Sequence, residues 1–101
     1  LPVTPYRIIA GANDDILAAA SWYQQEASRG REFTAAVFQT IEKICEDPLS
    51  HQTVRGVVRR RRILAFPYDI LFEAQPEFVR VIAVAHHQRK PGFWRGRLSD
   101  S

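Results

Sequence analysis

The sequence predicts a single α+β domain over residues 1–101 with the element order β-α-α-β-β-β, in which a helical hairpin packs on a small, mainly antiparallel sheet. Three observations predict it. A run typical of a strand lies within residues 1–10, and apolar residues then recur at helical spacing through residues 13–46. Three runs typical of strands follow within residues 57–86, joined by short connections. Residues 88–101 form a basic tail.

The first helix is expected to start in the polar segment that follows the first strand. Asn13 or Asp14 is the expected N-cap, because a side-chain oxygen there accepts a backbone N–H and acids favour the positive end of the helix dipole. Gly30 is expected to adopt the positive φ at the break between the helices. The second helix is expected from about residue 31 to 46, since Pro48 prevents its continuation.

The three later runs are expected to be antiparallel neighbours, because their connections are too short for a crossover. Residues 49–56, which precede them, are polar and irregular, which predicts a loop. The first turn lies between Ile63 and Pro67, and the second at residues 74–77. The last run, residues 79–85, is the least polar, which predicts a central strand that is buried on one or both faces.

The net charge of +3 is distributed unevenly along the chain. Residues 1–50 carry four basic and seven acidic side chains, a net charge of −3. Residues 51–101 carry ten basic and four acidic side chains, a net charge of +6. A positive field of this kind attracts polyanions or an acidic protein partner, so the second half is the expected binding region.

Composition also limits the class of protein. The chain has no apolar run of about 18 residues, so no membrane-spanning helix is expected. Its single cysteine, Cys45, cannot form an internal disulfide, which is typical of a reducing compartment and predicts a cytoplasmic protein. The chain contains no Met and begins at Leu1, so we expect that the native start has been lost or processed.

A motif in the second half indicates a family. Phe66-Pro67-Tyr68 precedes a strand, and a His-Xaa-Xaa-Arg-Xaa-Pro-Xaa-Xaa-Trp pattern from His86 to Trp94 follows the last one. Further matches occur at Asp14-Asp15, Trp22-Tyr23, Phe33, Asp47-Pro48, Arg60-Arg61, Ile70-Leu71-Phe72 and Arg97. On these residues the chain resembles the RelE/ParE superfamily of toxins from type II toxin–antitoxin modules, and it is most similar to the ParE-like, plasmid-stabilisation branch.

The resemblance implies a toxin that halts growth and is held inactive by an antitoxin encoded beside it. ParE-like members poison DNA gyrase, whereas RelE-like members cut messenger RNA in the ribosome. The expected function is growth inhibition by binding DNA gyrase. The first alternative is a RelE-like, ribosome-dependent mRNA endoribonuclease. The second is a non-toxic member that acts only as a co-repressor with its antitoxin.

RNA cleavage would need a base for the 2′-hydroxyl, a cation for the phosphorane charge and an acid for the leaving oxygen. Arg61, His86 and His87 are the candidates if the chain is a nuclease, and His51 and Glu73 are candidates for the base by residue type alone. The tyrosine that RelE-like toxins commonly carry after the last strand is missing from this sequence. We therefore assign no catalytic residue and expect an inhibitor without a cofactor. Adjacent histidines cannot both point at one ion from a strand, so no metal site is expected.

Alternation along a strand places Arg60 and Arg62 on one face and Arg59 and Arg61 on the other. One pair is expected to bind the acidic helices, and the other to meet solvent or a partner. Tryptophan and arginine in the tail are residue types that anchor interfaces. The residues expected to bind the target are Arg60, Arg61, His87, Arg89, Trp94, Arg95 and Arg97.

The expected antitoxin is a small, acidic protein with a disordered segment that folds over the helical hairpin and across the basic sheet. The chain should therefore form a hetero-oligomer with it, and bind operator DNA only through it. The residues expected to contact the antitoxin are Trp22, Phe38, Arg59 and Arg62.

Overall fold

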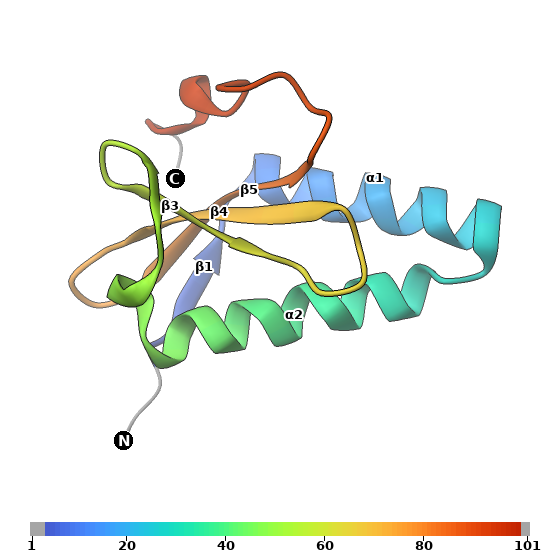
Figure 1. The fold of residues 1–101 in the computed structure, drawn as a ribbon, viewed down its shortest axis with the longest axis horizontal. Helices are drawn as coiled ribbons and strands as arrows, with labels where there is room; N and C mark the ends of the chain where they lie inside the picture. Colours follow the sequence, from blue (N-terminus) through green and yellow to red (C-terminus); the bar gives the residue numbers. More distant parts are fainter. Residues whose placement is uncertain (1–3, 100–101) are drawn as a thin grey trace.

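The computed structural model describes residues 4–99 and contains five strands, whose order across the sheet is β1-β5-β4-β3-β2. β1 runs parallel to β5, and the other neighbouring strands are antiparallel. The helices pack on one side of this mixed sheet (Figure 1), which confirms the predicted class and the order of the predicted elements. The elements are β1 (Tyr6–Ile8), α1 (Ala10–Ala27), α2 (Gly30–Glu46), a 3-10 turn (Pro48–Ser50), β2 (Thr53–Arg55), β3 (Val58–Arg62), β4 (Tyr68–Ala74), β5 (Val79–His86) and a second 3-10 turn (Arg95–Arg97).

Helix α1 begins at Ala10, so the assignment of Asn13 or Asp14 as its N-cap is wrong. The preceding residue, Ile9, has an extended backbone and makes no side-chain cap. The Ile9 carbonyl accepts the Asn13 N–H at 3.0 Å, and the Ile9 N–H donates to the Val81 carbonyl at 3.2 Å. Because Ile9 is also buried, the sheet and the core determine where the helix starts, and they override local propensity.

The break between the helices is made by Ser28, which has φ 55°, so the expectation of a positive φ at Gly30 is wrong. The Ser28 N–H donates to the Gln24 carbonyl, which closes α1. Gly30 is the buried first residue of α2, where a Cβ would lie 2.9 Å from the Ala20 carbonyl oxygen. Glycine therefore allows the two helices to approach closely. No helix within residues 4–99 is both long and apolar enough to cross a bilayer.

Strand β5 is the central strand between β1 and β4, as predicted, and most of its residues are buried. The β3–β4 turn lies between Ile63 and Pro67, also as predicted, and the Ile63 N–H donates to the Tyr68 carbonyl at 2.9 Å. The prediction of a loop over residues 49–56 is partly wrong, because β2 forms there and pairs with β3. All of β2 is exposed, so no alternation of hydrophobicity indicates this edge strand.

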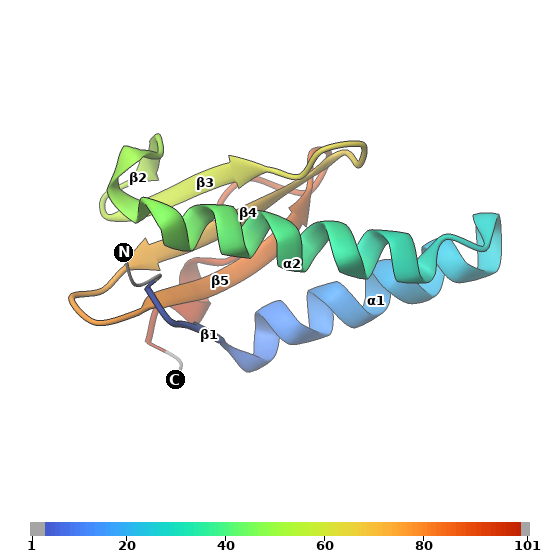
Figure 2. The same ribbon diagram turned by 90° about the horizontal axis from the view of Figure 1, so that it is seen from below.

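The largest part of the core lies between the helices and the sheet. The rings of Tyr23, Phe33, Phe66 and Tyr68 pack there, with centroids between 4.9 and 6.2 Å apart. On the other face, which lies behind the sheet in Figure 2, the tail runs back across the strands. Trp94 joins the buried cluster from this tail and is only 4% exposed. Both faces of the sheet are therefore covered, but the tail covers only part of its face.

Candidate functional site

A groove lined by basic side chains lies on the tail side of the sheet. It consists of two adjoining hollows of about 340 and 480 Å³, which share Arg60, Asp69 and His87. Residues paired across a sheet share a face, so Arg60 lies beside Leu71, and Arg62 beside Asp69. We call this surface the basic groove. Its cationic or titratable basic residues are Arg55, Arg60, Arg62, His86, His87, Arg89, Lys90 and Arg95.

The charges of the basic groove are poorly balanced. Asp69 is the single acid in its lining, and its carboxylate lies 3.2 Å from the His87 Nε2. Among the residues described, the Arg60 guanidinium donates one hydrogen bond, to the Gln52 side chain at 3.4 Å. The Arg89 guanidinium lies over the Phe93 ring, 4.0 Å from its centroid, which holds its charge near the groove. The groove therefore presents a positive field to solvent and suits an anionic ligand.

The other row of strand β3 arginines lies on the helix side, in agreement with the predicted alternation. Arg59 donates to the His51 carbonyl at 2.6 Å and to the Leu49 carbonyl at 3.3 Å. The Arg61 Nη1 lies 3.1 Å from the His51 Nε2. Among residues 4–99 neither arginine forms an ion pair with a helix, so the expected bridges to acidic helix residues are wrong. Carbonyls and an imidazole near β2 hold these side chains instead, outside the basic groove.

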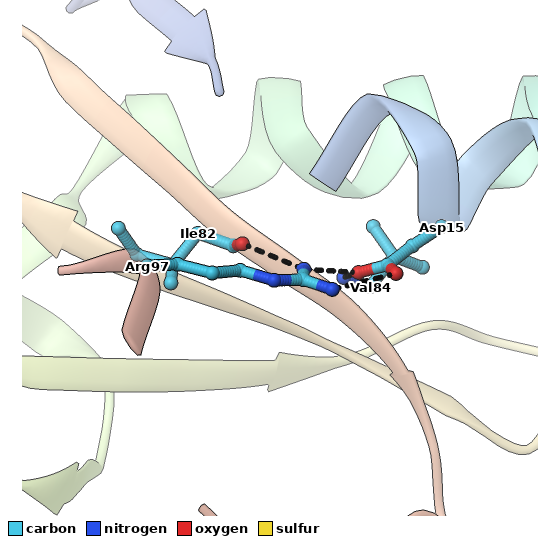
Figure 3. Close-up of polar contacts among 4 residues, drawn as sticks. All are labelled: Asp15, Ile82, Val84 and Arg97. Carbon is cyan, nitrogen blue, oxygen red and sulfur yellow. Dashed lines mark hydrogen bonds and ion pairs between the residues drawn. The ribbon is translucent and has the colours of Figure 1, made fainter. Parts of the chain in front are cut away.

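Two residues expected to bind the target are integrated into the fold. Trp94 is buried, and the Arg97 guanidinium forms a double hydrogen bond with the Asp15 carboxylate on α1, at 2.7 and 3.1 Å. Figure 3 shows this pair beside the outer edge of β5. The Arg97 side chain is 19% exposed and the Asp15 side chain is 8% exposed. Arg97 and Trp94 therefore position the tail, and neither side chain is exposed on the surface of this structure.

The Asp15–Arg97 pair also completes the sheet edge. The Asp15 carboxylate accepts the Val84 N–H at 3.0 Å, and the Arg97 guanidinium donates to the Ile82 carbonyl at 3.2 Å (Figure 3). The β4–β5 register shifts at this point, and a bulge of this kind turns backbone groups out of the ladder. Gly11 makes room, since a Cβ there would lie 2.8 Å from the Arg97 Nε. Sequence reasoning missed this role of Asp15 because its partner, Arg97, lies 82 positions away in the chain.

A second buried ion pair holds the tail against the sheet. Arg80 and Glu73 are directly opposite each other on β5 and β4, and their side chains lie 2.6 Å apart. The Arg80 guanidinium also donates to the Arg97 carbonyl at 3.1 Å. Sequence reasoning had proposed Glu73 only as a possible base. Its carboxylate is 13% exposed and is bound to Arg80, which indicates a structural role.

The nuclease candidates do not converge on one position. His86 lies on the helix side, where its ring packs edge-on against Tyr68 with centroids 5.0 Å apart and its Nδ1 accepts the Gln88 N–H. His87 lies in the basic groove beside Asp69, and Arg61 contacts His51 near β2. Arg61 is therefore held apart from the hollow that His86 and His87 both line. No group of three or more His, Cys, Asp or Glu residues within residues 4–99 could hold a metal ion.

A separate hollow lies between α1 and the end of β5, with a volume of about 560 Å³. Trp22 is 56% exposed at its rim and packs edge-on against Tyr23, whereas Phe38 is half-buried against the core. Burial raises the pKa of the Tyr68 hydroxyl, and the nearby Tyr23 raises it further. We call this surface the aromatic groove. Its lining is Asp15, Ala18, Ala19, Trp22, Tyr23, Pro67, Tyr68, Val84, His86 and Arg89.

Comparison with known proteins agrees with these observations. Residues 6–91 match the sequence model of a family described as "ParE toxin of type II toxin-antitoxin system, parDE". The structure is similar to a solved chain titled "Chromosomal ParDE TA system from P. aeruginosa", with a TM-score of 0.74 and 9% sequence identity. The similarity covers 83% of this chain and 96% of that one, and at this identity it shows a shared fold. No curated protein sequence matches this chain.

Proposed function

The chain belongs to the family of ParE toxins of type II toxin–antitoxin systems, and from this premise we propose that it halts growth by binding DNA gyrase and is neutralised by a cognate antitoxin. The observation that supports gyrase binding over RNA cleavage is the basic groove. It exposes several cations, while the His86 ring packs against Tyr68 at the rim of the groove and Arg61 is bound near β2. A surface of this kind can bind and trap a protein–DNA intermediate without any chemical step.

The charges indicate how such binding would work. Arginine and lysine side chains neutralise phosphates and release counterions, so binding should weaken steeply as salt rises. Arg60, Arg62 and Arg95 are exposed in the groove. We assign them, with His87 and Arg89, to the target surface. Arg61, Trp94 and Arg97 are omitted because their side chains are engaged within the fold.

The antitoxin is proposed to be acidic and to reach the aromatic groove. Trp22 is a large apolar side chain that is more than half exposed, and such a residue is typical of an interface anchor. Arg62 is exposed in the basic groove, so an acidic segment that also covered it would block the proposed target surface. Phe38 and Arg59 are less suited to this role, because Phe38 packs against the core and Arg59 is bound to two carbonyls.

A gyrase supercoiling assay tests the proposal. The variant Arg60→Glu/Arg62→Glu should lose inhibition by more than about tenfold, because like charges then face the DNA phosphates. Arg31→Glu is the matched control, since this exposed arginine lies on α2, away from the groove, and should leave inhibition unchanged. Equal inhibition by the groove variant would contradict the proposal.

Two further measurements separate the alternatives. Messenger RNA cleavage on purified ribosomes, with gyrase unaffected, would support a RelE-like nuclease. Normal growth during expression without an antitoxin would support a non-toxic co-repressor. Arrested growth with accumulation of gyrase-cleaved DNA is the outcome expected here.

A further inference from the structure

Two groups of permanent cations meet in the basic groove, one from the strands and one from the tail. The tail turns back from the end of β5 (Figure 1), which brings its cations to the hollow that Arg60 lines. Leu71 of β4 and Ala85 of β5 line the same hollow between them. The six arginine and lysine side chains are Arg55, Arg60 and Arg62 from β2 and β3, and Arg89, Lys90 and Arg95 from the tail.

These six charges are not neutralised within the fold. All six residues are exposed, and within residues 4–99 none of them forms an ion pair. The acid of the groove, Asp69, is engaged by His87, whose Nε2 lies 3.2 Å from the carboxylate. The buried Arg80 and Arg97, by contrast, are each paired with a carboxylate. The groove therefore suits a ligand that carries several negative charges.

The spacing of the arginines on β3 suits a chain of charges. Arg60 and Arg62 lie two residues apart on one face of the strand, a separation of about 6.7 Å along it. One strand of duplex DNA carries a phosphate for about every 3.4 Å of helix axis, so successive cations of the groove can meet successive phosphates. Five of the six cations are arginines, whose planar guanidinium groups bind phosphate through two parallel hydrogen bonds.

The groove offers no open aromatic ring to a nucleic-acid base or to a protein partner. Trp94 is only 4% exposed, and the half-buried Phe93 ring lies under the Arg89 guanidinium, 4.0 Å from its centroid. Single-strand binders stack bases on aromatic side chains, and protein interfaces place aromatic anchors near their centre. A duplex already stacks its bases internally and presents its phosphates outward. These observations therefore favour a duplex backbone over a single strand or an acidic protein segment.

We propose that the basic groove binds the sugar–phosphate backbone of duplex DNA directly, with phosphates on the β3 arginines and on the cations of the tail. This inference rests on the proposed function, because a complex of DNA gyrase with its substrate holds such a duplex. It names the DNA, and not the surface of the gyrase protein, as the ligand of the groove. Phosphate contacts carry no sequence information, so the binding is independent of base sequence.

The test titrates a short, fluorescein-labelled DNA duplex with the full chain, without gyrase, and follows fluorescence anisotropy. Six phosphate contacts predict a slope of about −5 for the logarithm of the binding constant against that of salt concentration, and so a loss of about 10³-fold between about 50 and 200 mM salt. A duplex of unrelated sequence should bind equally well. Absence of binding, or binding that salt does not weaken, would overturn the proposal.

Three competitors distinguish the duplex from other polyanions. Unlabelled duplex DNA should displace the probe more effectively than the same concentration of negative charge supplied as single-stranded DNA, duplex RNA or polyglutamate. A single strand or duplex RNA that competes better than duplex DNA would assign the groove to another nucleic acid and overturn the proposal. Equal competition by polyglutamate would do the same, since the groove would then bind acidic protein segments as readily.

Paired variants locate the contact. Arg60→Gln/Arg62→Gln should weaken duplex binding by at least about tenfold and make the salt slope shallower by about 2, because two phosphate contacts are lost. Arg31→Gln/Lys43→Gln removes the same charge from exposed positions of α2, on the other side of the sheet, and should leave the slope unchanged. Circular dichroism checks that both variants fold. Equal effects of the two variants would show a response to net charge alone and would overturn the site.

The gyrase assay keeps the two proposals separate. Gyrase inhibition by a chain that does not bind duplex DNA overturns the DNA contact alone. Duplex binding without gyrase inhibition overturns the proposed function alone.

Discussion

The helix side and the tail side of the sheet bury different kinds of side chain within one folded unit. On the helix side, Phe33 is fully buried, and aromatic rings pack around it at centroid distances of about 5 Å. On the tail side, Trp94 is accompanied by two buried arginine–carboxylate pairs, Arg80 with Glu73 and Arg97 with Asp15. The first arrangement depends on apolar area, and the second depends on specific partners.

This difference divides the arginines into those that stabilise the fold through a buried ion pair and those that stay exposed. Apolar packing is non-directional, so the helices need only a stripe of suitable residues. An ion pair needs one particular partner, and that of Arg97 lies 82 positions away in the chain. Arg80 and Arg97, which have such partners, hold the tail against the sheet. Those on the exposed face of β3 remain available to a target.

The largest expected effect on stability comes from a substitution on the helix side of the sheet. Phe33→Ala should lower the free energy of unfolding by about 3–5 kcal/mol, because it leaves a cavity in the aromatic cluster. Urea denaturation followed by circular dichroism measures this. Trp22→Ala, on the exposed side of α1, is the control and should cost less than about 1 kcal/mol. A loss at Phe33 no greater than at Trp22 would contradict the assignment of the main core.

The next largest effect on stability comes from a substitution on the tail side of the sheet. Arg97→Met should lower the free energy of unfolding by about 3 kcal/mol, because the buried Asp15 carboxylate then lacks its cation. Adding Asp15→Leu should recover part of that loss, since an apolar pair replaces an unpaired charge. The double-mutant cycle is measured by urea denaturation. If the two losses simply add, the pair is not coupled and the interpretation of the tail fails.

Substitution of the exposed arginines should affect stability much less than substitution of the buried Arg97. Arg60→Glu/Arg62→Glu should change the free energy of unfolding by no more than about 0.5 kcal/mol for each substitution, because both side chains lie at the surface. Gyrase inhibition by the same protein should be lost. A variant that unfolds readily would show that these arginines serve the fold, and its loss of inhibition would then say nothing about target binding.

The smallest effect is a difference in pH dependence between the two sides. Burial raises the pKa of both the Tyr68 hydroxyl and the Cys45 thiol on the helix side, and nearby Tyr23 and Glu42 raise them further. Folding therefore favours the neutral forms. Their contribution is fully present below the unfolded pKa values, about 8.5 for a thiol and 10 for a phenol, and is lost as the pH rises through the folded ones.

Urea denaturation between neutral pH and about pH 10 should thus show falling stability, and Tyr68→Phe/Cys45→Ala should flatten that fall. The tail side should contribute little to it, since its arginines keep their charge throughout this range. An equally steep fall in the double variant would mean that other groups cause the loss.

The periodicity of the sequence was sufficient for most of the fold. It predicted the helical hairpin, the central position of β5 and the turn between Ile63 and Pro67, because each depends on neighbours within a few residues. It failed for the start of α1, where a contact of Ile9 with β5 decides, and for β2, whose residues are all exposed. Local patterns carry no information about the contact of Ile9 with β5 or the pairing of β2 with β3.

The candidate site shows the same division. By itself the sequence determined which half of the chain is basic, and that Arg60 and Arg62 share a face, because strand alternation is a local property. Only the tertiary structure decided which cations are neutralised. It brought Asp15 to Arg97 and enclosed Trp94, whereas Arg60 and Arg62 stay exposed. Charge neutralisation and strand pairing depend on distances in space, and residues far apart in sequence set those distances only once the chain is folded.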